Sequence, residues 1–232
     1  MTRDKITQGS HKRTGLFGGT FDPIHLGHLQ VAQDVKEHFL LDKIIFIPSA
    51  QPPHKTSKII ADAIDRIEMT RLSVSARPDF LISDIELKRT GPSYSIDTVS
   101  YFKQVSPPDT ELYFVLGLDA FLEMDTWKSY KELFNQVPFI VMNRPGVGYE
   151  SEKENWQMIK DYLQKRISEG YTFSISKSCC IHKEKYPVYL YHVTPMDISS
   201  TQIRNLLRKG RSIHSLVTEN VEQYIQTQGL YR

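Results

Sequence analysis

The segment 14–31, TGLFGGTFDPIHLGHLQV, constrains the fold more than any other part of the chain. A short apolar run ends at Gly18-Gly19, and an amphipathic segment begins at HLGH, residues 25–28. This order is typical of a strand, a glycine-rich turn and the first turn of a helix. Glycines let backbone N–H groups approach an anion, and a helix N-terminus adds further unpaired N–H groups. The segment therefore predicts a phosphate-binding turn.

Two histidines lie three residues apart at the start of the predicted helix. His25 and His28 should project from one side of its first turn, and Gly27 between them leaves room for a bulky group. A surface pair that caps the helix is the simpler alternative. A metal site is another, but two histidines supply only part of the ligands that it needs. The segment has neither G-x-G-x-x-G nor G-K-[ST], so a dinucleotide-binding motif and a P-loop are not indicated.

Strand-like and helix-like segments alternate along most of the chain. We expect strands over 43–47, 80–85, 111–116 and 139–142, with helical periodicity between them. The apolar positions Ile60, Ile64, Ile67 and Leu72 give the helix between the first two of these strands. This pattern predicts an α/β fold with a Rossmann-like, doubly wound parallel sheet, followed by a C-terminal helical portion after residue 199. An amphipathic helix around 156–167 should lie outside the core. The segments 171–176 and 188–193 would pair as a last hairpin or add strands to the sheet edge.

Length and composition limit the class of protein. A chain of 232 residues with 40% hydrophobic residues fits one domain, which we expect over 14–232 after a disordered leader over 1–13. A net charge of +2 argues against a dedicated nucleic-acid partner, and no apolar run approaches the ~20 residues of a membrane span. The leader has no apolar signal sequence, and the adjacent Cys179 and Cys180 are too close for ordinary disulfide geometry. Two reduced thiols favour a cytoplasmic location.

Three further polar segments follow predicted strands. The proline-rich loop after residue 47 can hold Lys55 over a ligand, although an exposed loop lysine is the simpler alternative. The turn 90–93 precedes a helix that Ser95 and Asp97 can cap without any ligand. Asp119 lies just past a predicted central strand, where parallel sheets bind their ligands.

A second polar motif, DISSTQIR, occupies residues 197–204. Ser200 and Thr201 come just ahead of apolar helical positions, so they are first of all N-cap candidates. The same geometry exposes N–H groups and hydroxyls to an anion, with Arg204 one turn further on. Together with the histidine motif, this predicts two helix N-termini on opposite sides of one polyphosphate.

Four blocks together resemble the bacterial nicotinate-mononucleotide adenylyltransferases of the nucleotidyltransferase superfamily. They are GGTFDPIHLGH, PPHK, GPSYSIDT with the later GLDAFLEMDTW, and ISSTQIR. The resemblance covers nearly everything from Thr14 to the C-terminus, and 146–186 is its least similar part, expected to be a family-variable insertion. It implies transfer of the adenylyl group of ATP to nicotinate mononucleotide, giving deamido-NAD and pyrophosphate in NAD biosynthesis. Mg²⁺ would accompany the ATP.

The resemblance also implies a role for each motif residue. ATP would be bound by Gly18, Gly19, Thr20, Phe21, Ser200, Thr201 and Arg204. The catalytic residues would be His25, His28 and Lys55. Nicotinate mononucleotide would be bound by Thr90, Ser93, Tyr94, Asp119 and Trp127, with the tryptophan stacked on the pyridine ring. The two substrates would be the partners, and a homo-oligomer is left open.

Two related enzyme classes share part of this pattern. Phosphopantetheine adenylyltransferases share the first motif in a shorter chain, and cytidylyltransferases have a second motif closer to R-T-x-G-I-S-T. The blocks around Ser93 and Trp127 favour the nicotinate enzymes over both. A nucleotide-binding regulator that kept the fold and lost the chemistry is a further alternative. The presence of both histidines, Lys55 and Arg204 argues against it.

Overall fold

The computed structural model describes residues 12–51, 60–143, 151–194 and 196–232, with one sheet at their centre. Its eight strands have the order β3-β2-β1-β4-β5-β8-β7-β6. The strands are β1 (Lys12–Gly19), β2 (Lys43–Pro48), β3 (Phe80–Ile82), β4 (Thr110–Gly117), β5 (Phe139–Asn143), β6 (Thr172–Ser174), β7 (Cys179–Ile181) and β8 (Val188–His192). The first six in spatial order run parallel, and β7 and β6 are antiparallel additions at one edge. The predicted α/β fold is confirmed, with a sheet that is mostly parallel.

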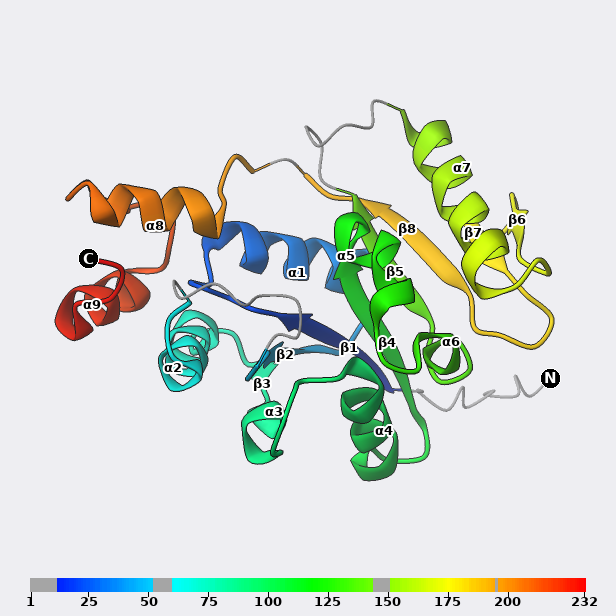
Figure 1. Cartoon of the computed structure of the whole chain (residues 1–232), viewed down its shortest axis with the longest axis horizontal. Helices are drawn as coiled ribbons and strands as arrows, with labels where there is room; N and C mark the ends of the chain where they lie inside the picture. Colours follow the sequence, from blue (N-terminus) through cyan, green and yellow to red (C-terminus); the bar gives the residue numbers. More distant parts are fainter. Residues whose placement is uncertain (1–11, 52–59, 144–150, 195) are drawn as a thin grey trace, which may run out of the picture.

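Helices cover both faces of the sheet (Figure 1). They are α1 (Leu26–His38), α2 (Ala63–Val74), α3 (Ile85–Lys88), α4 (Ser95–Val105), α5 (Leu118–Leu122), the 3₁₀ helix η1 (Met124–Thr126), α6 (Tyr130–Leu133), α7 (Glu152–Tyr162), the π-helix η2 (Leu163–Ile167), α8 (Ser200–Arg208) and α9 (Glu219–Gln228). One hydrophobic cluster lies under α1, α2, α8 and α9, and the other under α4 to α7 and η2. Among the described residues, no helix has the length and apolar character to cross a membrane.

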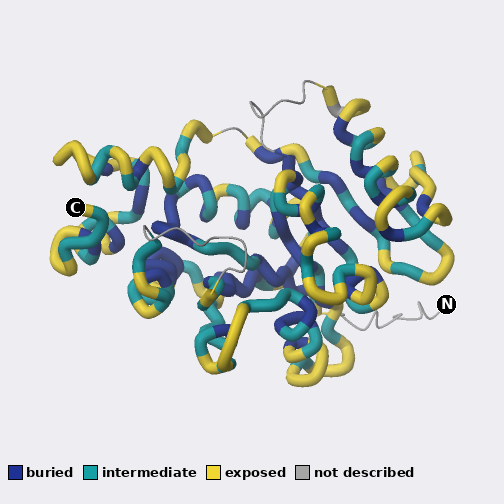
Figure 2. The backbone as a smooth tube through the Cα atoms, in the orientation of Figure 1, coloured by how far each residue is buried: buried dark blue, intermediate teal, exposed yellow. Residues whose placement is uncertain are grey.

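Successive residues of the central strands alternate between the two clusters. In β1, Leu16 packs on the side of α4, and Phe17 packs on the side of α1. In β4, Phe114 packs on the side of α4, and Val115 packs on the side of α1. Parallel strands that are covered on both faces read as nearly continuous apolar runs, which is why the sequence revealed them. Buried residues concentrate in the sheet and on the inner helix faces (Figure 2).

Two boundaries and one helix face differ from expectation. β1 begins at Lys12, so the last two residues of the expected leader belong to the sheet. The strand expected over 80–85 ends at Ile82, and α3 follows it. In α2, Ile64 is 73% exposed, whereas Arg66 is buried. The apolar spacing around Ile64 therefore indicated the wrong face of this helix.

The last part of the sheet shows which alternative holds for 171–176 and 188–193. β8 lies inside the sheet, parallel to β5, and the unexpected strand β7 separates it from β6. These segments therefore add strands to the sheet and do not form a hairpin with each other. Cys179 and Cys180 lie in β7 as buried free thiols, and burial raises the pKa of Cys180 to about 12.

Candidate active site at the carboxyl ends of the central strands

Two adjoining pockets open where β1 and β4 end. The order of the strands reverses between β1 and β4, which is the usual position of a ligand site in such sheets. The basic pocket, about 660 Å³, is lined by the glycine turn, both histidines, 199–201, Arg204 and Arg208. The aromatic pocket, about 380 Å³, is lined by Ser93, Tyr94, Phe114, Trp127 and neighbours. The two share Gly18, Gly19, Thr20, Gly117 and Asp119, so a ligand in one reaches a ligand in the other.

The Phe21 ring packs against the glycine turn from the side of the hydrophobic core. A Cβ at Gly19 would lie 2.8 Å from the Phe21 ring, so no larger residue fits there. Phe21 has a φ of 48°, and its ring packs edge-on against Phe17 and His28, with centroids 5.6 and 5.1 Å away. Phe21 is 3% exposed, so it shapes the turn from the core side while also lining the basic pocket.

The histidine pair lies as the sequence predicts, on one side of the first turn of α1. The rings of His25 and His28 stack with centroids 3.7 Å apart. The backbone N–H of His25 donates to Nδ1 of His28 at 3.2 Å. A neutral His28 therefore keeps its proton on Nε2, where it is a donor. The room beside Gly27 is taken by the His25 ring, because a Cβ there would lie 3.0 Å from His25 Nδ1.

The second motif begins α8 and docks on the turn that precedes α1. Ser199 is the N-cap, and its hydroxyl accepts from the N–H of Gln202 at 3.1 Å. Because Ser199 caps the helix, the Ser200 hydroxyl can make a different contact, and it donates to the Pro23 carbonyl at 2.9 Å. Arg204 Nη2 donates to the Thr201 hydroxyl at 3.2 Å. The N-termini of α1 and α8 thus line one pocket, as the sequence predicts.

Two buried charges support the basic pocket, and sequence reasoning missed both. Asp22 is 4% exposed and Arg66 is 1% exposed. Arg66 donates to the carbonyls of Thr20 at 2.8 Å, Ala61 at 2.9 Å and Ala50 at 3.2 Å. Burial lowers the pKa of Arg66, and the Asp22 carboxylate opposes that shift. The available signal was the helical spacing of Arg66 with other buried residues of α2, Met69, Thr70 and Ser73.

The turn before α4 closes the aromatic pocket on one side. The Ser93 hydroxyl accepts from the N–H groups of Ala50 and Gln51 at 3.0 and 3.2 Å, which joins this turn to the end of β2. The N-cap of α4 is Tyr94, without any side-chain capping bond, so the expected capping by Ser95 and Asp97 is wrong. Asp97 instead pairs with Lys128, 3.3 Å away. Thr90 is exposed and is not among the lining residues of either pocket.

The opposite wall contains Trp127 and Phe114. Trp127 follows η1, is half-buried, and meets Phe114 edge-on with centroids 6.4 Å apart. The ammonium group of Lys128 lies 4.6 Å from the Tyr94 ring centroid. Asp119, the second residue of α5, is exposed and lines both pockets.

A buried acid, Glu86, is a further lining residue that the sequence did not reveal. It is 7% exposed, and one of its oxygens accepts from the Thr98 hydroxyl at 2.8 Å. Its other oxygen has no hydrogen-bond partner among the described residues. Lys55, expected to be catalytic, lies outside the described residues.

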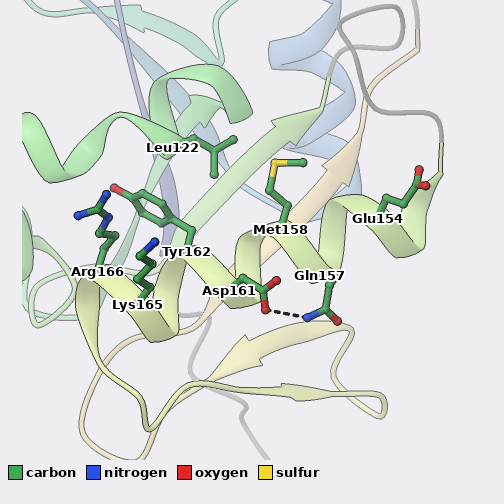
Figure 3. A pocket seen from close by; sticks show the side chains of 8 residues that line it. All are labelled: Leu122, Glu154, Gln157, Met158, Asp161, Tyr162, Lys165 and Arg166. Atoms are coloured by element: carbon green, nitrogen blue, oxygen red, sulfur yellow. Dashed lines mark hydrogen bonds between the residues drawn. The ribbon is translucent and has the colours of Figure 1, made fainter.

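A third hollow, about 540 Å³, shares no lining residue with these two pockets (Figure 3). It lies against α7 and η2, with Glu154 toward one end of the helix pair and Lys165 and Arg166 toward the other. Gln157 donates to Asp161 at 2.7 Å within it. Within the parts of the chain that the structure describes, both histidines and Arg204 converge instead on the pocket at the carboxyl edge of the sheet.

A doubly wound sheet with pockets at its switch point is the architecture typical of nucleotide-binding α/β proteins. The sequence model of the family described as Cytidylyltransferase-like matches residues 16–206, and the chain belongs to this family. It is 41% identical to a probable nicotinate-nucleotide adenylyltransferase of Desulfatibacillum aliphaticivorans, over 94% of this chain and 99% of that protein. A protein of the same name from Geobacter metallireducens is 39% identical, over 94% of this chain and 98% of its own. The resemblance of the four sequence blocks is confirmed.

A solved structure supports the fold. The nicotinic acid mononucleotide adenylyltransferase of Plasmodium falciparum, complexed with NaAD, superposes with a TM-score of 0.69. The alignment covers 95% of this chain and 98% of that one, at 19% identity. At 19% identity this similarity supports the fold assignment alone.

Proposed function

We propose that this chain transfers the adenylyl group of ATP to nicotinate mononucleotide, giving deamido-NAD and pyrophosphate in NAD biosynthesis. The relatives named above support this reaction. The observation that carries the proposal is the junction of a basic pocket with an aromatic pocket along Gly18, Gly19, Thr20, Gly117 and Asp119. A triphosphate fits the first pocket, a pyridine nucleotide fits the second, and their reacting phosphates meet at the junction.

The reaction needs no nucleophile from the protein. A phosphate oxygen of nicotinate mononucleotide forms a bond to the α-phosphorus of ATP, and the bond from that phosphorus to the β-bridging oxygen breaks. The electron pair leaves with pyrophosphate. Catalysis is then mainly positioning together with stabilisation of charge on the phosphate oxygens.

The basic pocket offers the groups that such a transfer uses. His28 would donate from Nε2 to the transferring phosphoryl group, and His25, stacked on it, would hold its ring in place. The glycine turn would approach the phosphates through backbone N–H groups. Ser200, Thr201 and Arg204 would hold the β- and γ-phosphates from the N-terminus of α8. Lys55 stays a predicted bridge between the phosphates of both substrates.

The aromatic pocket would bind the acceptor. Trp127 would stack on the pyridine ring, and the turn at Ser93 and Tyr94 would face the nicotinate carboxylate. The first-turn N–H groups of α4 and the Lys128 ammonium group supply positive potential at that end. Asp119 would face the nucleotide between the two pockets. The role of Thr90 in binding nicotinate mononucleotide stays a prediction.

Mg²⁺ enters the proposal as the companion of ATP. The groups that line the basic pocket are mainly cationic, hydroxyl and backbone N–H donors, which suit phosphate oxygens. We expect the ion to be held largely by the triphosphate and water, which is the usual arrangement for Mg²⁺ at nucleotide sites. A cytoplasmic location also belongs to the proposal and agrees with the two free thiols.

Pyrophosphate release tests the function directly. The purified chain is incubated with ATP, Mg²⁺ and nicotinate mononucleotide, and pyrophosphate and deamido-NAD are measured. We expect both products in equal amounts, and no reaction when phosphopantetheine replaces the acceptor or CTP replaces ATP. Turnover with phosphopantetheine or CTP, and none with the proposed pair, would contradict the assignment.

A further inference from the structure

We propose that Tyr231, the penultimate residue, is a positioning residue for the ATP triphosphate. It acts through Asp22, which in turn holds Arg204. The proposal rests on the proposed function, because it takes the basic pocket as the triphosphate site. None of the four sequence blocks includes Tyr231.

Asp22 connects three separate parts of the chain beside the basic pocket. Its Oδ1 accepts from the Tyr231 hydroxyl at 2.7 Å and from the N–H of Ala61 at 3.1 Å. Its Oδ2 lies 3.5 Å from Arg204 Nη1. The same Nη1 donates to the Asp22 carbonyl at 2.6 Å. Both the backbone and the side chain of Asp22 therefore orient this guanidinium.

A buried carboxylate beside a polyanion site requires such partners. An unpaired charge is costly to bury, so Asp22 needs donors on both oxygens. The donors on Oδ1 direct Oδ2 toward Nη1 of Arg204, while Nη2 donates to the hydroxyl of Thr201, which lines the pocket. Without the Tyr231 hydroxyl, the carboxylate has only Ala61 on that oxygen and is drawn toward Arg204. The arginine would then be more fully neutralised and less available to phosphate.

The C-terminus turns back toward the pocket for a local reason. α9 ends at Gln228, and Gly229 adopts a φ of 64°. The N–H of Leu230 then donates to the Ile225 carbonyl at 3.1 Å, which is the bond that reverses a chain after a helix. This reversal brings the Tyr231 ring inward, where burial and Asp22 both raise the pKa of its hydroxyl.

The same helix offers a matched control. Tyr224 on α9 donates to Asp65 Oδ1 on α2 at 2.8 Å, so it too links the C-terminal helix to an aspartate. Neither Tyr231 nor Tyr224 lines the basic pocket. Tyr224→Phe removes one tyrosine–aspartate hydrogen bond of the same kind, without touching Asp22 or Arg204.

The experiment compares ATP binding in Tyr231→Phe and Tyr224→Phe by calorimetry without acceptor, followed by steady-state kinetics. Loss of a hydrogen bond to a charged group predicts about tenfold weaker ATP binding in Tyr231→Phe. KM for ATP should rise in proportion, while KM for nicotinate mononucleotide stays within twofold of wild type. Tyr224→Phe should leave both substrate affinities within twofold. The melting temperatures of both variants measure the loss of stability that removal of a tyrosine–aspartate hydrogen bond causes in each.

A double variant tests whether Tyr231 acts through Asp22. Asp22→Asn should weaken ATP binding, and adding Tyr231→Phe should weaken it little further, because coupled residues are not additive. Unchanged ATP affinity in Tyr231→Phe, equal losses in both tyrosine variants, or fully additive losses in the double variant would overturn the inference. A wild-type chain that binds no ATP would overturn the proposed function, and the inference with it.

A different set of contacts carries a second inference, about the helix pair α7–η2. We infer that this part of the chain positions Trp127 through Asp125, which also rests on the proposed acceptor site. The N–H of Asp125 donates to the Tyr162 hydroxyl at 2.7 Å, and Arg166 Nε lies 3.3 Å from Asp125 Oδ2. Asp125 belongs to η1, which ends next to Trp127. Tyr162 and Arg166 lie close together where α7 continues into η2 (Figure 3).

Tyr162→Phe tests this link, with Tyr171→Phe as the control. Tyr171 lies in the same part of the chain, but its hydroxyl donates to the Tyr186 carbonyl at 2.9 Å and not to η1. Tyr162→Phe should weaken nicotinate mononucleotide binding about threefold to tenfold and leave ATP binding unchanged, since the two hydrogen bonds of this hydroxyl to Asp125, at 2.7 and 3.4 Å, are lost. Equal acceptor affinity in Tyr162→Phe and wild type, or equal losses in both variants, would overturn it. A wild-type chain that binds ATP but no nicotinate mononucleotide would overturn the proposed acceptor and this inference, leaving the Tyr231 inference intact.

Discussion

The basic pocket and the aromatic pocket share one sheet edge but are stabilised by different interactions. Around the basic pocket, Arg66 and Asp22 are almost fully buried and bond to parts of the chain that are far apart in sequence. Around the aromatic pocket, Trp127 and Phe114 meet through their rings, and Lys128 and Asp97 form an ion pair whose side chains are about half exposed.

This difference follows from what each pocket is proposed to bind. Charge developing on phosphate oxygens is stabilised by donors that are fixed before the reaction, and fixed donors need a rigid polar network behind them. A planar ring mainly needs shape and apolar surface, which side-chain packing supplies. Substitutions at the basic pocket should therefore have larger effects than those at the aromatic pocket.

The largest effect is expected from the network behind the basic pocket. Arg66→Met leaves the carbonyls of Thr20, Ala50 and Ala61 without this donor, and each buried acceptor left unpaired costs about 1–3 kcal/mol. Chemical denaturation measures the free energy of unfolding. Arg71→Met is the control, because Arg71 lies on the same helix and pairs with Glu68 at the surface. Equal stability of the two variants would contradict the assigned role of Arg66.

The next effect is expected at the reacting phosphate. His28→Ala should lower kcat by ~10²-fold or more, the scale of losing one preorganised transition-state donor. Initial rates of pyrophosphate release measure it. His38→Ala at the far end of α1, where the ring contacts Phe39 and Tyr191, should be close to wild type. Near-normal turnover of His28→Ala would remove this residue from the catalytic set.

The ratio of kcat/KM for nicotinate mononucleotide to that for nicotinamide mononucleotide should be similar to or smaller than the effect of His28→Ala. In the proposed binding mode, nicotinate presents a carboxylate to the N-terminus of α4, whereas nicotinamide would present an NH₂ to the same donors. A buried donor left unpaired costs roughly 1–3 kcal/mol, which predicts ~10²-fold discrimination in kcat/KM. The two mononucleotides are compared as substrates at saturating ATP. Equal kcat/KM values would refute carboxylate recognition at this turn.

The smallest effect on the kinetics is expected from Trp127, whose ring is proposed to stack on the acceptor. Trp127→Ala should raise KM for nicotinate mononucleotide roughly two- to tenfold, since aromatic stacking contributes about 0.5–1.5 kcal/mol beyond burial. KM for ATP should stay unchanged. Trp156→Ala is the control, because Trp156 packs on Phe173, with centroids 4.7 Å apart, and lines neither pocket.

Fluorescence locates the acceptor independently of turnover. Nicotinate mononucleotide should quench the fluorescence of Trp156→Phe, in which only Trp127 remains, and should not quench that of Trp127→Phe. Quenching that follows Trp156 instead would place the acceptor away from the aromatic pocket.

The amino-acid sequence determined the local features of this protein. The strand, glycine turn and helix around residues 14–31, and the capped helix that starts at Ser200, follow from periodicity and from the residue types that turns and helix ends require. The parallel core strands were visible as apolar runs. These features were enough to predict the fold class and to place the two polar motifs at one pocket.

Only the tertiary structure decided how that site is supported. Arg66 belongs to a helix whose apolar spacing indicated another face, and its carbonyl partners Thr20 and Ala50 are distant in sequence. Tyr231 reaches Asp22 only because the chain reverses after α9. Periodicity reports which residues meet a core, but it does not report which polar atoms meet each other once long-range packing excludes water. For that reason the two polar motifs could be recognised in the sequence, and the buried network that supports them could not be predicted.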